Sequence, residues 1–174
     1  MNRFHAFTRE LWAEFPGFRL VVKEASPLMR CLYWLLVMPL WNRRFLTHYT
    51  TVLRYRVYMP QALIGTDAGY RTLRHERVHM RDARRTGFLP FAVSYLFLLP
   101  TVLTLRSYWE LRGYVETMRV ELEETGSIPD ESIEFIAARF TGSDYLFMCP
   151  FPGLIRRRLR AARARLLAEA SGER

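Results

Sequence analysis

An uncharged run of 18 residues constrains the fold of this 174-residue chain more than any other feature. The run extends from Phe88 to Leu105 and reads FLPFAVSYLFLLPTVLTL, which reaches the lower length limit of a transmembrane helix. Pro90 and Pro100 suit a helix start and a break rather than one straight span. We expect a buried core helix here, with a membrane-embedded hairpin as the alternative.

Other features bear on the compartment in which the chain works. A second apolar run, CLYWLLVMPLW at 31–41, is short for a span and contains Pro39. The first 25 residues lack the apolar segment of a signal peptide. Cys31 and Cys149 are too few and too distant for a disulfide framework or a cysteine zinc cluster. We therefore expect a cytoplasmic protein, with membrane association as the alternative.

The composition favours one mostly helical domain. Half of the residues are hydrophobic, which is enough for a buried core and too many for a disordered chain. Sequence patterning predicts about five helices and one small sheet or edge strand, hence a mostly α (α+β) fold. We predict a single domain over 1–174, with a lead-in segment at 1–25, irregular or partly helical, and a basic helix at 154–174.

Capping residues and turn residues set the bounds of the predicted elements. Ser26-Pro27 opens a helix that would run to about Trp41. Residues 49–59, YTTVLRYRVYM, read as one strand that carries Arg54 and Arg56 on one face, which suggests a sheet edge. The other predicted helices are 68–86, capped by Asp67 and followed by Gly87, then 106–124, 130–140 and 154–170.

Two histidines four residues apart lie in the predicted helix 68–86, which reads HERVH from His75 to His79. Residues four apart on an α-helix are separated by about 40° around its axis, so both imidazoles point the same way. Neutral imidazoles at this spacing can bind one zinc ion. Glu76 can reach a water on that ion and act as general base. The alternative is a pair of helix histidines with no metal.

A third ligand can be sought by elimination among the acidic residues that follow. Asp82 is on the same face as the histidines but displaced along the helix, so it suits a role in orienting an imidazole. Of the residues on the next helix, Glu116 is on a different face from Glu110, and Glu121 is about 16 Å further along. We therefore choose Glu110, which small Gly113 follows. The alternative is that Glu110 is a surface glutamate or one in an ion pair, for which Arg106 is a candidate partner.

The sequences HERVH and, downstream, ELRGY resemble the gluzincin branch of zinc metallopeptidases. The resemblance implies a minimal, single-domain, zincin-like fold in which His75, His79 and Glu110 bind Zn²⁺. It assigns Glu76 as the general base for hydrolysis of peptide or protein substrates, which would lie extended along the strand at 49–59. Tyr114 is the candidate for stabilising the oxyanion, with a packed core tyrosine as its alternative.

A shared zinc ion also constrains the apolar run. If residues 88–105 crossed a bilayer once, His79 and Glu110 would lie about 27 Å apart and could not bind one ion. Zinc binding therefore requires the run to fold back or to form a core helix. A long apolar hairpin beside the site could still dip into a membrane.

The C-terminal residues 156–174 hold seven arginines and two acids, which makes the basic charge local, since the rest of the chain carries only +4. Ile155, Leu159, Ala162 and Leu166 follow a helical spacing, so one face can pack on the domain. An anionic membrane surface is the functional alternative, and nucleic acid is disfavoured because no known recognition pattern is present. The competing function is therefore a non-enzymatic helical protein that uses 88–105 and this tail to associate with membrane or nucleic acid.

Overall fold

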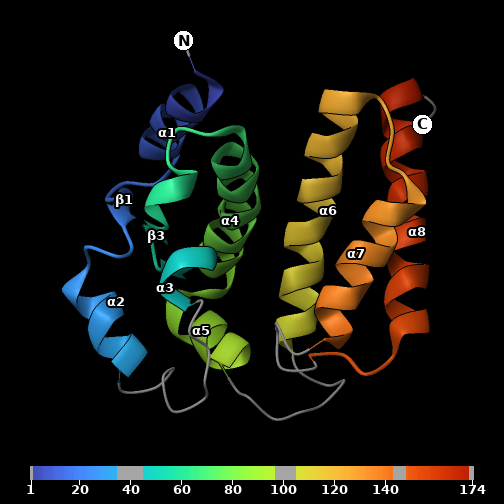
Figure 1. Cartoon of the computed structure of the whole chain (residues 1–174). Coiled ribbons are helices and arrows are strands. Elements are labelled where there is room, and N and C mark those ends of the chain that lie inside the picture. Colours follow the sequence, from blue (N-terminus) through green and yellow to red (C-terminus); the bar gives the residue numbers. More distant parts are fainter. Residues whose placement is uncertain (1, 35–44, 97–104, 143–147, 173–174) are drawn as a thin grey trace. The chain divides into compact units, whose positions relative to one another are not determined.

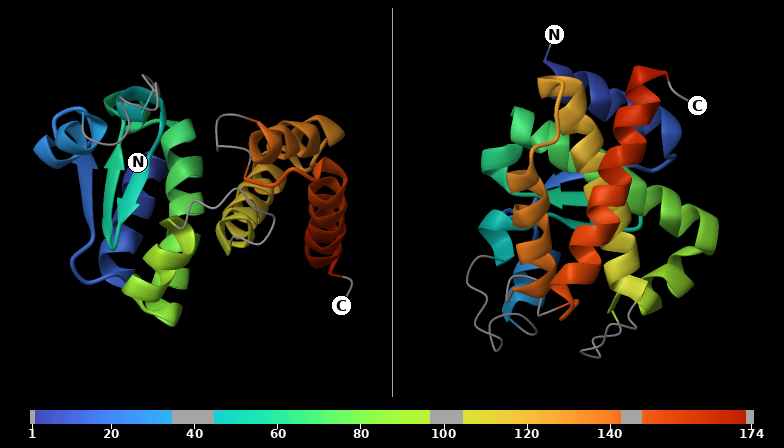
Figure 2. Two further views of the ribbon diagram at one scale, coloured as in Figure 1. Left: turned by 90° about the horizontal axis from the view of Figure 1, so that it is seen from below. Right: turned by 90° about the vertical axis from the view of Figure 1, so that its right-hand side faces the viewer.

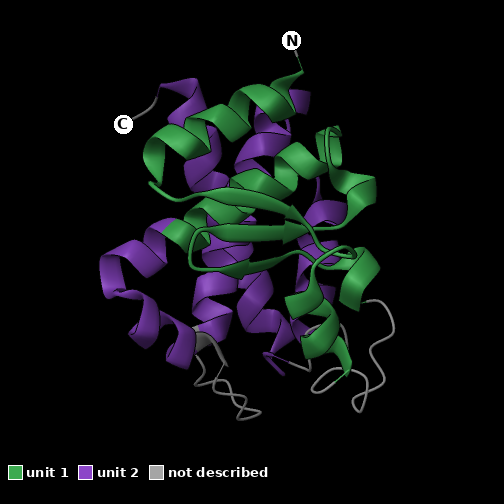
Figure 3. Ribbon diagram, turned by 90° about the vertical axis from the view of Figure 1, so that its left-hand side faces the viewer, with its two compact units in different colours: residues 1–80 green, residues 81–174 purple. Residues whose placement is uncertain are grey.

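The computed structural model describes residues 2–34, 45–96, 105–142 and 148–172. Within these residues it contains eight α-helices and one sheet of three strands, which confirms a mostly helical α+β fold (Figure 1). The chain divides into two compact units, residues 1–80 and 81–174 (Figure 3). The predicted single domain over 1–174 stays a prediction.

The first unit contains the sheet, and helix α4 begins in it and ends in the second unit. Its elements in chain order are α1 (Arg3–Glu14), β1 (Arg19–Val22), α2 (Pro27–Leu32), α3 (Phe45–His48), β2 (Thr51–Leu53), β3 (Arg56–Met59), a 3-10 turn (Gln61–Leu63) and α4 (Asp67–Thr86). The second unit continues with α5 (Phe88–Leu96), α6 (Leu105–Thr125), α7 (Asp130–Thr141) and α8 (Pro152–Ser171).

The sheet has the order β1-β3-β2, with β1 parallel and β2 antiparallel to the central strand β3. The predicted single strand at 49–59 is therefore wrong, because this segment is a hairpin in which Val52 pairs with Val57. Arg54 lies in the turn with a φ of 58°, the left-handed conformation that a tight reversal requires. Arg54 and Arg56 consequently do not share one face of one strand.

Side chains from α1, β3 and α4 form the core of the first unit. The cluster includes buried residues from each element: Phe4 and Leu11 of α1, Val57 of β3 and Leu73 of α4. The segment 1–25, predicted as an irregular or partly helical lead-in, thus supplies α1 and β1. The strand β1 was not predicted, because its four residues show no clear alternation of apolar and polar side chains.

Three helices form the core of the second unit: α6, α7 and α8 lie side by side in Figures 1 and 2. Their bounds follow the predicted helices within two residues at either end. The predicted apolar face of the basic tail is confirmed, since Ile155, Leu159, Ala162 and Leu166 are all buried. Ile155, Leu159 and Leu166 also belong to the main core cluster of the unit.

Several tail arginines form ion pairs within the second unit. Arg156 pairs with Glu134 at 2.7 Å, and Arg163 pairs with Asp130 at 2.6 Å. These acids lie on α7, so part of the tail charge is neutralised by the neighbouring helix. The tail is therefore less basic at its surface than its sequence indicates.

The apolar run that opens at Phe88 forms helix α5 over its first nine residues. Residues 97–104, in the second half of the run, lie outside the described residues, and so do residues 35–41 of the helix predicted to reach Trp41. In the described part of the chain, no helix has both the length and the apolar character that a membrane crossing needs.

Candidate metal site

Helix α4 starts at a tightly fitted turn that fixes the position of its histidines. The Thr66 hydroxyl accepts a hydrogen bond from the Gly69 backbone N–H at 3.0 Å and caps the helix. The predicted Asp67 cap is therefore wrong by one residue. A Cβ atom on Gly69 would lie 2.0 Å from the carbonyl oxygen of Leu63, so only glycine lets the chain approach this closely.

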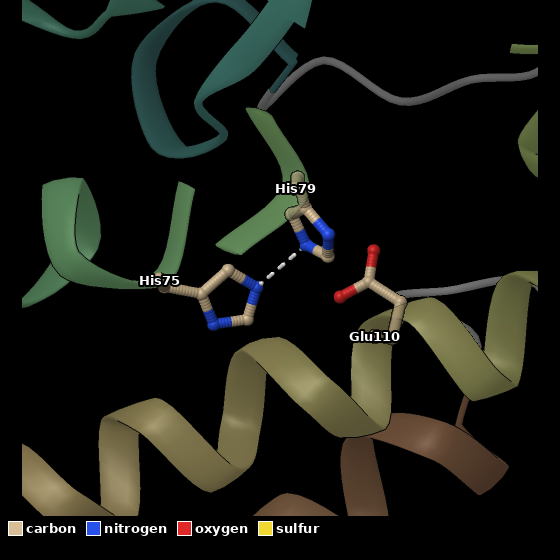
Figure 4. Close-up of side chains that lie close together, drawn as sticks. All are labelled: His75, His79 and Glu110. Atoms are coloured by element: carbon tan, nitrogen blue, oxygen red, sulfur yellow. Dashed lines mark hydrogen bonds between the residues drawn. The ribbon is translucent and has the colours of Figure 1, made fainter. Parts of the chain in front are cut away.

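The two imidazoles of α4 lie against each other as their spacing predicts. The Nε2 atoms of His75 and His79 are 3.1 Å apart, joined by the dashed line in Figure 4. The ring planes are inclined by 70°, and His79 is only 5% exposed. One of the two Nε2 atoms carries the shared proton in this arrangement, and a metal ion could replace that proton.

Glu110, on α6, completes a group of three ligand atoms. One nitrogen from each histidine and a carboxylate oxygen of Glu110 all lie within 4.8 Å of one another, with the carboxylate turned towards the rings (Figure 4). Glu110 is 2% exposed. The residues chosen from the sequence as metal ligands are thus brought together, and no second group of this kind occurs among residues that the structure describes.

The donor set and its spacing fit a small divalent cation. Around a tetrahedral zinc ion with bonds of about 2.0 Å, ligand atoms are about 3.3 Å apart, close to the separation of the two Nε2 atoms. The carboxylate of Glu110 would also offset one charge of such a cation in a buried position, while the two neutral nitrogens would bind it through their lone pairs.

Glu76 is half-buried on α4, next to His75 and three residues before His79. Its negative charge acts on Lys23, the only lysine of the chain. Burial lowers the pKa of Lys23 from 10.5 to about 7, against the smaller opposing effects of Glu76 and then Glu24. An ionised Glu76 and a buried amine are therefore electrostatically linked in the first unit.

The lysine amine is held by atoms of the chain that leads into β2. Its Nζ donates hydrogen bonds to the Tyr49 carbonyl oxygen at 2.6 Å and to the Thr51 hydroxyl at 2.8 Å. The same atom lies 3.6 Å from the ring centre of Phe45, a cation–π distance. These contacts fix the position of the amine within the unit.

Asp82 does not have the geometry that was expected of it. Both of its carboxylate oxygens accept hydrogen bonds from Arg112, at 2.8 and 2.9 Å, so the predicted role in orienting an imidazole is not what this carboxylate does. The same hydrogen bonds are the main cause that raises the pKa of Arg112. Arg112 follows Glu110 by two residues on α6, so the ion pair holds the ligand-bearing turn of that helix.

The remaining candidates from the sequence have other partners. Glu116 forms an ion pair with Arg119 at 3.6 Å, and Glu121 accepts a hydrogen bond from the Ser132 hydroxyl at 2.6 Å. Tyr114 is buried in the core of the second unit, where its ring packs against Phe140. Its role in stabilising an oxyanion stays a prediction.

Two residues with a bearing on the site were not singled out from the sequence. Lys23 could have been noticed in the sequence, because it is the single lysine in a chain with 25 arginines. Arg112 had none, because one arginine among many does not reveal a partner 30 residues away.

No protein-family model, no curated protein and no solved structure matches this chain. The resemblance to gluzincins therefore rests on the HERVH motif and the downstream glutamate alone.

Proposed function

We propose that the protein is a zinc-dependent metallopeptidase of gluzincin type. The observation that carries the proposal is the convergence of His75, His79 and Glu110, which lie 35 residues apart at most and present ligand atoms within 4.8 Å. This is the donor set that catalytic zinc sites use, with three protein ligands and one position left for water or substrate.

His75 and His79 would hold the ion through their Nε2 atoms, and Glu110 through a carboxylate oxygen. When bound, the ion supplies Lewis-acid chemistry: it lowers the pKa of a bound water towards neutrality and polarises the carbonyl under attack. The carboxylate of Glu110 compensates charge that would otherwise be costly to bury.

Glu76 would act as general base. It is adjacent to one ligand and one helical turn from the other, so its carboxylate can reach the reacting water without occupying a ligand position. It accepts the proton as the new C–O bond forms and delivers it to the leaving amine as the C–N bond breaks. The positive charge of Lys23, when protonated, helps to keep Glu76 ionised before that step.

The proposed substrate is a peptide or protein. An extended peptide can add to the free edge of a sheet, and β2 is an edge strand of the three-stranded sheet in the first unit. The segment 49–59 therefore still provides an edge strand of the sheet, as expected, although that strand is β2 with only three residues.

The Glu76→Gln variant tests the reaction separately from metal binding. We expect it to lose cleavage of an unfolded protein such as denatured casein by about 100-fold or more, because the general base is removed, while its zinc content stays unchanged. Glu123→Gln, on the exposed side of α6, is the matched control and should keep full activity. Activity that persists in Glu76→Gln would refute the assignment of the base.

A further inference from the structure

Helix α5 exposes large apolar side chains that a water-facing helix does not normally carry. Phe88 is 42% exposed, Leu89 71% and Val93 47%. The exposed large apolar residues of α1, α7 and α8 are single ones, namely Trp12, Phe135 and Leu167. A helix with three such residues within six positions needs an explanation beyond chance exposure.

Leu89 and Val93 lie opposite the face through which α5 packs, and Phe88 lies to one side of it. Phe91 contacts the ring of Trp109 on α6, with ring centres 5.3 Å apart, and the Ser94 hydroxyl accepts a hydrogen bond from the Trp109 indole N–H at 3.0 Å. At 100° per residue, Phe91 and Ser94 fall on one side of the helix, and Leu89 and Val93 on the other. One face is thus anchored to the protein, and the other is presented outward.

A basic segment precedes the apolar face directly. Arg81, Arg84 and Arg85, at the end of α4, are all exposed, and the acid among them, Asp82, is buried against Arg112. The charges exposed on this segment are therefore all positive. Gly87, with a φ of 86°, ends α4 and leads the chain into the apolar helix.

We propose that α5 and the end of α4 dock the protein on an anionic membrane surface. The apolar face of α5, here defined as Leu89 and Val93 with Phe88 at its edge, would enter the boundary between headgroups and acyl chains, and the three arginines would contact lipid phosphates. In this proposal the described residues of α5, about 13 Å of helix, lie in the interface. All of these residues belong to the second unit.

Sedimentation of the full chain with vesicles tests the proposal. The wild type should bind phosphatidylcholine vesicles that contain about one third phosphatidylglycerol, and bind pure phosphatidylcholine vesicles at least about tenfold more weakly, because the arginines need anionic lipid. The Leu89→Ser/Val93→Ser variant should lose binding to the anionic vesicles by about tenfold or more. Its circular dichroism should match the wild type, because both side chains point outward.

Matched variants on α8 separate the α5 face from the basic tail. Leu167→Ser removes an exposed apolar residue, and Arg157→Gln/Arg158→Gln removes two exposed charges. Neither should weaken vesicle binding by more than about twofold. The proposal is overturned if the wild type does not bind anionic vesicles, if the α5 variant binds as well as the wild type, if the α8 variants lose binding equally, or if a DNA duplex binds the protein more tightly than the vesicles do.

Discussion

The carboxylate of Asp82 receives two hydrogen bonds from the guanidinium of Arg112, at 2.8 and 2.9 Å. Asp82 is 3% exposed, so this bidentate pair compensates a buried charge. The pair joins the end of α4 to α6 inside the second unit. Asp82 follows His79 by three residues, and Arg112 follows Glu110 by two. The pair therefore joins the two helices close in sequence to the proposed ligands.

Removing the arginine of this pair should be costly. In Arg112→Met, Asp82 would remain buried without its main partner, and we expect the free energy of unfolding to fall by about 2 kcal/mol. Urea denaturation followed by circular dichroism measures the change. Arg119→Met is the control: the acids that Arg119 pairs with, Glu116 and Glu169, are more exposed than Asp82, so its loss should cost less than about 1 kcal/mol.

A substitution at Gly69 should reverse the usual effect of adding a methyl group to a helix. Alanine normally stabilises a helix by about 1 kcal/mol over glycine. At this position the new Cβ would meet the Leu63 carbonyl oxygen at 2.0 Å, so we expect Gly69→Ala to destabilise the fold by about 2 kcal/mol. Gly153→Ala is the control: it lies on α8 with open space around it and should be neutral or stabilising. Thermal melts of both variants measure the difference.

Lys23 should make stability depend on pH. Below pH 7 its amine is protonated in both the folded and the unfolded chain, so the cost of burying the charge is fully present. Between about 7 and 10.5 the folded chain has lost the proton that the unfolded chain still binds, so the free energy of unfolding rises with pH. Thermal melts across this range should show the increase.

Replacement of the lysine provides the control for that slope. Lys23→Met has no amine to titrate, so the rise of stability between pH 7 and 10.5 should disappear. Arg19→Met, which removes an exposed charge at the other end of β1, should retain the rise. An unchanged slope in Lys23→Met would show that another group titrates in this range.

The sequence predicts the helical part of the fold well, because the residues that start and end a helix act locally. Gly126 follows the last residue of α6 with a φ of 73°, and the Ser26 hydroxyl caps α2 by accepting a hydrogen bond from the Met29 N–H. The turn at Arg54 had no such signal, since arginine rarely adopts a positive φ and no glycine or asparagine marks the reversal. The hairpin was therefore read as one strand.

The candidate site shows the same division between local and long-range information. The approach of His75 to His79 follows from helical periodicity alone, and it is confirmed. Glu110 could be chosen only by elimination, because its position depends on how two helices pack. The partner of Asp82 could not be chosen at all, since many arginines were equally available in the sequence.

The measurement that tests the central claim most directly is zinc content per chain, by elemental analysis, for the wild type, His79→Ala and Glu110→Gln. We expect about one zinc ion per wild-type chain and a loss of tight binding in both variants, because each removes one of three protein ligands. His48→Ala, which alters an exposed histidine on α3, is the control and should retain the wild-type content. A wild-type protein that binds no zinc even after metal is added, or variants that bind as much as the wild type, would contradict the account.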